Sequence, residues 1–212
     1  MSSNLGADFS GLFKEKNLWQ IYRQGPPFYE GSAFNGWVVF GTLALLAAFA
    51  CEHLWWQSGH PESAIDPRDI FLSWANVGIS FTGTILGFLL AGFAVLFTLF
   101  KPETLLRLQQ VTRPGKKLPE LKLLVCVFID VFVHYLAFLF WCILVLVVGY
   151  KNGPATVVSR SLGTLCPAIP SLVTHAVLVL WGTWFVLLVV KLKSFIYNLH
   201  QSLLLAVADS VD

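Results

Sequence analysis

The sequence predicts an all-α integral membrane protein with four transmembrane helices. The 212 residues are 56% hydrophobic and 12% charged, with eight Trp and a mean hydropathy of +0.70. A typical soluble chain is about 45 to 50% apolar and about 25% charged. Four apolar stretches also reach the roughly 20 residues that a helix needs to cross a hydrocarbon core about 30 Å thick. Composition and segment length therefore exclude an ordinary soluble protein.

The predicted spans cover residues 35–56, 70–100, 123–150 and 171–190. The second and third exceed the minimum length, so we expect tilt or extension beyond the lipid. Asp66 before Pro67 is typical of a helix start, and Pro119 restarts the chain as helix after the second connection. The connections are short, which favours a single transmembrane bundle over residues 1–212. No apolar segment precedes residue 30, so we expect no cleaved signal peptide.

Lysine and arginine predict the orientation, because excess positive charge stays on the cytoplasmic side. With both termini inside, eleven of the fourteen basic residues face inward: Lys14, Lys16, Arg23, Lys101, Arg107, Arg113, Lys116, Lys117, Lys122, Lys191 and Lys193. The other three, Arg68, Lys151 and Arg160, face outward. We therefore expect an N-in, C-in multi-pass protein.

The second span carries a stripe of small and polar residues at steps of three and four. Its members are Asn76, Ser80, Gly83, Thr84, Gly87, Ala91 and Ala94. In lipid, helices associate through close packing of small residues and hydrogen bonds of Ser, Thr or Asn. The stripe is therefore predicted to be a helix-packing face, either within the chain or between copies of it, and a pore lining is a further reading.

Asp130 and His134 lie one helical turn apart inside the third apolar stretch, "VFIDVFVHYLAF". A carboxylate in hydrocarbon is costly unless it is protonated, paired or exposed to water. We expect the two side chains to form one unit. Two alternatives stay open: a buried pair that fixes helix register, or a proton-sensitive or ion-facing site.

His53 and His175 are predicted at similar depth on the first and fourth spans, where two histidines could hold a b-type haem. An ordinary place for His53 beside the Trp belt is the alternative. A disulfide between Cys51 and Cys166 is also compatible with the outer side. No catalytic motif is present, so we expect a non-enzymatic protein with no metal site and no cofactor.

The predicted inner side holds three amphipathic segments. In the tail, residues 191–208, the apolar positions at helical spacing are Leu192, Phe195, Ile196, Leu199 and Leu203. Residues 8–22 and the stretch after Pro102 show similar patterns. Such helices lie in the headgroup layer beside membrane lipid, or they dock a soluble protein.

The size, the four spans, the Gly-rich stretch "GTILGFLLAGFAVL" and the amphipathic tail resemble the small membrane subunits of bacterial anti-phage defence systems, of the type of the Kiwa membrane component. CRISPR-associated small membrane proteins share these features. The resemblance implies a homotetramer in the bacterial inner membrane whose cytoplasmic face holds a soluble, DNA-binding effector, with no direct contact between the membrane subunit and nucleic acid. It is an analogy of topology and assigns no functional residue.

Two functions are therefore expected as alternatives. The first is an oligomeric membrane scaffold or sensor that recruits a cytoplasmic effector protein. The second is a small ion- or proton-conducting channel that uses Asp130 and His134. A haem-binding membrane anchor is a third reading, carried by the two outer histidines alone.

Overall fold

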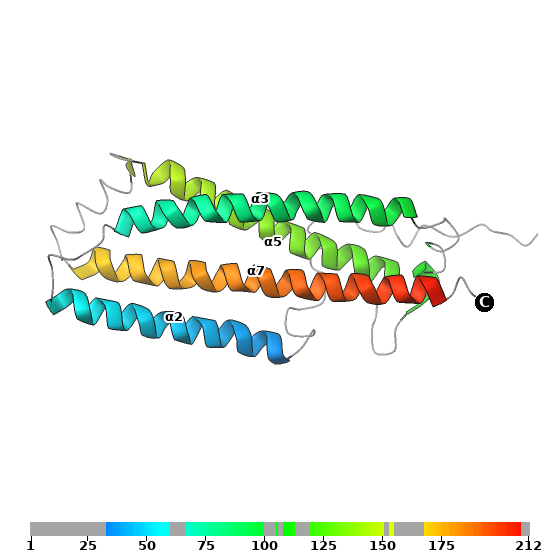
Figure 1. Ribbon diagram of the computed structural model, residues 1–212, viewed down its shortest axis with the longest axis horizontal. Coiled ribbons are helices and arrows are strands. Elements are labelled where there is room, and N and C mark those ends of the chain that lie inside the picture. The colour runs from blue at the N-terminus through cyan, green and yellow to red at the C-terminus, as the bar shows by residue number, and fades with distance from the viewer. Residues whose placement is uncertain are drawn as a thin grey trace, which may run out of the picture. The chain divides into compact units, whose positions relative to one another are not determined.

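Four long helices make up most of the part of the chain that the computed structural model describes, which is residues 33–59, 67–99, 105, 108–112, 119–150, 153–154 and 168–208. They are α2 (Ala33–Gly59), α3 (Pro67–Leu99), α5 (Glu120–Val148) and α7 (Ala168–Ala208) (Figure 1). Those residues contain no strand. The prediction of an all-α fold is confirmed.

All four helices are long and apolar enough to cross a membrane. The qualifying segments are Ala33–Trp55, Asp69–Ala94, Glu120–Val148 and Ser171–Gln201. By length and composition, these four segments agree with the prediction of a multi-pass membrane protein. The fourth segment extends to Gln201, well beyond the predicted end at residue 190.

Prolines mark the starts of α3, α5 and α7. α3 begins at Pro67, and α5 begins directly after Pro119. Pro170 lies in the first turn of α7, where its missing N–H would have had no intrahelical partner. α7 then runs without a break through Lys191 to Ala208. Of the other amphipathic segments, residues 8–22 lie outside the described part, and residues 105 and 108–110 are helical in the segment after Pro102.

Contacts divide the chain into two compact units, and each is described by itself. Unit 2 contains α2, α3 up to Gly87, α5 from His134 and α7 up to Val190. Its core is aromatic. Phe138 of α5 meets Trp184 of α7 edge-on with ring centroids 5.4 Å apart, and Phe81 of α3 lies 4.7 Å from Phe185 of α7. Such contacts hold α3, α5 and α7 together without a hydrophobic force between helices.

Two glycines allow close approach of helices in unit 2. A Cβ added at Gly78 of α3 would lie 2.6 Å from Sγ of Cys142 on α5. A Cβ at Gly182 of α7 would lie 2.8 Å from Cδ1 of Leu46 on α2. A methyl group at either position would force the neighbouring side chain to shift, so both glycines serve packing inside the chain.

Unit 1 contains α3 from Phe88, α5 up to Val133 and α7 from Lys191. Phe93 of α3 stacks on Phe128 of α5 with ring centroids 3.9 Å apart, and Phe195 of α7 lies 5.9 Å from the same ring. The backbone N–H of Glu120 donates to the carbonyl of Val111 at 2.9 Å and fixes the start of α5. An aromatic cluster again joins three helices.

Candidate functional site

The small-residue stripe of α3 is exposed along its whole length. Asn76, Ser80, Gly83, Thr84, Gly87, Ala91 and Ala94 are all exposed. At 3.6 residues per turn the residues from Asn76 to Ala91 fall within an arc of about 100°. The stripe is therefore one continuous face of α3.

Packing inside the chain uses the opposite face of α3. Ala75, Gly78, Thr82, Leu86 and Leu89 are the buried residues of that helix. A Cβ added at Gly83 or Gly87 would meet nothing within 4 Å, in contrast to one at Gly78. The stripe therefore has space for a second backbone to approach, and no described part of this chain fills it.

The polar members of the stripe differ in their hydrogen bonds. Thr84 Oγ1 donates to the carbonyl of Ser80 at 2.8 Å, so its own helix satisfies this hydroxyl. The side chains of Asn76 and Ser80 make no hydrogen bond with any described residue. An amide that faces lipid has no water to bond with, so a neighbouring helix is the natural partner for Asn76.

Asp130 forms an ion pair with Lys191. Nζ of Lys191 on α7 donates to Oδ2 of Asp130 on α5 at 2.5 Å. The side chains are 9% exposed for Lys191 and 21% for Asp130. The ammonium of Lys191 therefore lies directly against the carboxylate of Asp130 in a poorly hydrated place. Sequence reasoning missed this partner because it placed Lys191 outside the fourth span, and the expected pairing of Asp130 with His134 stays a prediction.

Tyr135, the residue after His134, has a defined role in unit 2. Its hydroxyl donates to the backbone carbonyl of Leu188 on α7 at 3.1 Å, and the side chain is fully buried. A buried phenol needs such a partner. The pattern of the sequence gave no signal for it, because a carbonyl acceptor can be anywhere along a neighbouring helix.

His53 of α2 and His175 of α7 lie side by side in unit 2. Nδ1 of His53 is 2.9 Å from Nε2 of His175, and the ring centroids are 5.1 Å apart. Two axial ligands of one metal, at about 2.0 Å each, would have nitrogens about 4 Å apart with the haem plane between them. The rings therefore do not fit axial haem ligation in this arrangement.

Three other predictions concerned a metal site, a disulfide and the apolar positions of the tail. The described residues contain no group of three or more His, Cys, Asp or Glu that could hold a metal ion. Cys51 is free and exposed, and Cys166 lies outside the described part. In the tail, Phe195 is buried against Phe128, whereas Ile196 and Leu203 are exposed and Leu192 and Leu199 are half-buried.

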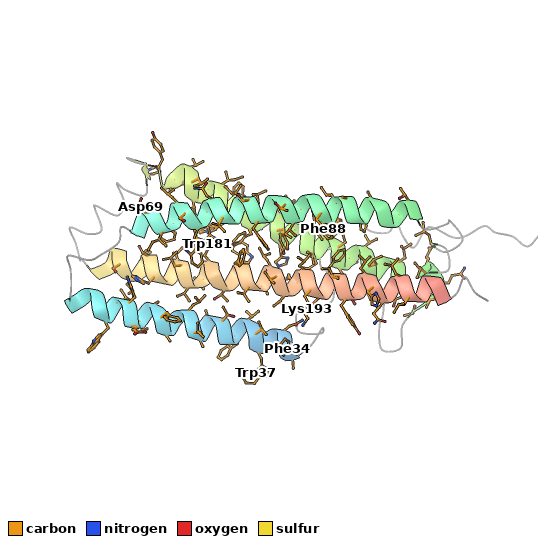
Figure 2. All side chains as sticks on the ribbon, viewed as in Figure 1. Phe34, Trp37, Asp69, Phe88, Trp181 and Lys193 are labelled. Carbon is orange, nitrogen blue, oxygen red and sulfur yellow. The ribbon has the colours of Figure 1, made fainter. Side chains whose placement is uncertain are left out.

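Aromatic side chains cover much of the surface that would face lipid. Trp37 of α2 is 72% exposed, and Figure 2 shows it pointing away from the neighbouring α7. Trp181, in contrast, lies between α7 and α3, where it stacks on Phe71 with ring centroids 6.0 Å apart. This division is typical of a helix bundle in lipid, where apolar rings face both outward and inward.

Comparison with known proteins returned no matching family model, no matching curated protein and no matching solved structure. The function of the chain therefore has to be argued from its own residues.

Proposed function

We propose that the protein is a non-enzymatic, homo-oligomeric membrane scaffold or sensor that recruits a soluble partner on the cytoplasmic side. The observation that carries the proposal is the exposed stripe on α3. A membrane helix that faced only lipid would need no continuous row of Gly, Ser, Thr and Asn. A second copy that packs on Gly83 and Gly87 would bring two backbones close and give Asn76 a hydrogen-bond partner.

The recruiting face is the predicted inner side of the membrane. Eleven of fourteen basic residues are assigned there, and the tail carries exposed Ile196 and Leu203 beside Lys193. A surface with positive charge and apolar side chains suits an acidic, amphipathic protein partner. By analogy with the small membrane subunits of anti-phage systems, the partner would be a DNA-binding effector, the assembly a tetramer and the location the bacterial inner membrane.

A Gly87→Leu variant tests self-association. The leucine side chain would fill the space between two stripes, so we expect the oligomer to dissociate while the monomer stays folded. The control is Gly92→Leu, because Gly92 also has open space around its Cβ but lies off the stripe. Native mass spectrometry and light scattering of detergent-purified protein measure the assembly. A strictly monomeric wild type, or a Gly87→Leu variant that assembles unchanged, would sink the proposal.

The second candidate, an ion- or proton-conducting channel, depends on the intramembrane charges. In the structure the carboxylate of Asp130 is engaged by Lys191, so conduction past it would have to break or bypass this pair. A flux measurement in liposomes separates the two functions. A scaffold keeps its assembly and shows no flux in wild type or in an Asp130→Asn variant, whereas a channel conducts and loses flux in that variant.

A further inference from the structure

We propose that His53 and His175 form a proton-sensitive clasp that holds α2 against α7. The two half-buried rings belong to a short hydrogen-bonded chain. Nδ1 of His53 lies 2.9 Å from Nε2 of His175, and Nδ1 of His175 lies 2.7 Å from the carbonyl oxygen of Ser171. The inference goes beyond the proposed function and does not depend on it.

The backbone carbonyl fixes where the protons are. A carbonyl oxygen only accepts, so Nδ1 of His175 carries a hydrogen. A neutral imidazole has one N–H, which leaves Nε2 of His175 as the acceptor. Nδ1 of His53 must therefore donate to it, and Nε2 of His53 keeps a free lone pair.

These hydrogen-bonded rings can bind one extra proton while the clasp stays closed. Protonation of His53 at Nε2 keeps both hydrogen bonds and makes the bond to His175 charge-assisted. A second proton would have to enter at Nε2 of His175, which is already the acceptor. Two N–H groups would then point at each other, between two positive rings with centroids 5.1 Å apart. The closed clasp holds one extra proton, whereas two separated imidazoles hold two.

Few charged side chains of the described residues lie near the two rings. On α2, Cys51 and Glu52 adjoin His53 and are exposed. α7 carries no acidic or basic residue from Ala168 to Val190 besides His175, and α5 has neither from Tyr135 to Val148. Asp69 in the first turn of α3 is exposed, and among the described residues no carboxylate bonds to either ring.

α2 is the helix that depends most on such a bond. Only 6% of the residues in its apolar window are buried, against 22% in each of the other three helices. Among its described side chains Asn35 alone is buried. The packing of Leu46 on Gly182 is a second contact with α7, but it offers little area. Opening the clasp therefore frees the end of α2 that carries His53.

The direction of the pH effect follows from the proton count. The parted state binds one proton more than the closed clasp, so acid favours the parted state and higher pH favours the clasp. Where the parted state carries two extra protons and the clasp carries one, the equilibrium moves about tenfold toward the parted state for each unit by which the pH falls. Under the predicted orientation this end of α2 faces outside, so the signal is acidification of the outer side.

Electron paramagnetic resonance distances test the clasp in the full-length protein. Spin labels are placed at Cys51 and at Leu172→Cys in nanodiscs, with Cys126, Cys142 and Cys166 changed to alanine and unlabelled protein in excess. We expect one narrow distance at pH 8 and a longer population that grows as the pH falls to 4.5.

The variant His175→Gln keeps an acceptor for His53 but does not titrate, so its distance should stay narrow throughout. His200→Gln makes the same change at an exposed position and should behave as wild type.

An independent measurement needs no spin labels. In the unsubstituted chain with ¹⁵N-histidine, an N–H···N coupling between two imidazoles should be present at pH 8 and lost in acid. A wild-type distance that does not change with pH, an acid response of His175→Gln equal to that of wild type, or the absence of the coupling at pH 8 overturns the clasp.

Discussion

Removing one member of the Asp130–Lys191 pair is expected to destabilise the protein more than any other single change that keeps side-chain size. Lys191→Met removes the ammonium and keeps most of the apolar stem, and Asp130→Asn removes the negative charge at nearly constant shape. Each removes the charge that faces the remaining partner at 2.5 Å. With side chains only 9% and 21% exposed, little water can replace the lost partner.

The size of the effect follows from this burial. Leaving one partner of a fully buried pair uncompensated costs about 3 to 5 kcal/mol. Because Asp130 keeps part of its surface exposed, we expect a lower cost of about 2 to 3 kcal/mol for each single change. In the double variant neither charge is present, so its cost should fall short of the summed single costs by about 2 kcal/mol.

The assay is a double-mutant cycle on the free energy of unfolding in detergent micelles, followed by tryptophan fluorescence. The control cycle combines Asp130→Asn with Lys193→Met, because Lys193 is two residues further on and exposed. The unfolding free-energy costs of these two changes should add within about 0.5 kcal/mol. If Asp130→Asn and Lys191→Met are additive to the same degree, the ion pair contributes nothing to stability and the reasoning is refuted.

Three further predictions concern packing, a buried hydrogen bond and orientation. Gly78→Ala should cost about 1 to 3 kcal/mol of unfolding free energy, because the new methyl meets a sulfur at 2.6 Å, and adding Cys142→Ala should recover part of it. Equal stability of Gly78→Ala and wild type would contradict this packing. Tyr135→Phe should cost about 0.5 to 1.5 kcal/mol in the same assay, because the hydroxyl donates to a carbonyl of α7, and no loss would argue against that bond. In a chain without its native cysteines, a membrane-impermeant thiol reagent on intact cells should label Glu62→Cys and not Lys116→Cys, and the reverse pattern would invert the orientation.

Hydropathy alone was enough to locate four helices, although not the end of the fourth, because a bilayer sets a minimum length and an apolar composition for every span. The predicted and observed starts of α3 agree at Pro67, since proline determines a helix start locally. The two close approaches of helices at glycines in unit 2 were not predictable in this way. Gly78 and Gly182 look like any other glycine in an apolar run, and their neighbours Cys142 and Leu46 are set by how helices turn toward one another.

The stripe on α3 is a second case in which the sequence pattern does not identify the contact partner. Spacing identifies residues that share a helix face, but it does not say what that face meets. In the structure the described residues pack on Ala75, Gly78 and Thr82 instead, and they leave Gly83 and Gly87 in open space. A small-residue pattern therefore predicts a close contact, and only the fold decides whether the partner belongs to the same chain.

The missed partner of Asp130 has a specific physical cause. The fourth span was predicted to end at residue 190, which placed Lys191 on the inner face outside it. Asp130 lies about 10 Å inside the third span on the same assumption, at 1.5 Å per residue, so the two charges seemed to differ in depth. The structure instead continues α7 as an apolar helix to Gln201 and pairs the lysine with the carboxylate. A charge that has a partner is far cheaper to keep within a bundle than an isolated one, and it does not mark where the membrane ends. An acidic and a basic residue on two antiparallel spans should therefore be tested as a pair before either is used as a boundary.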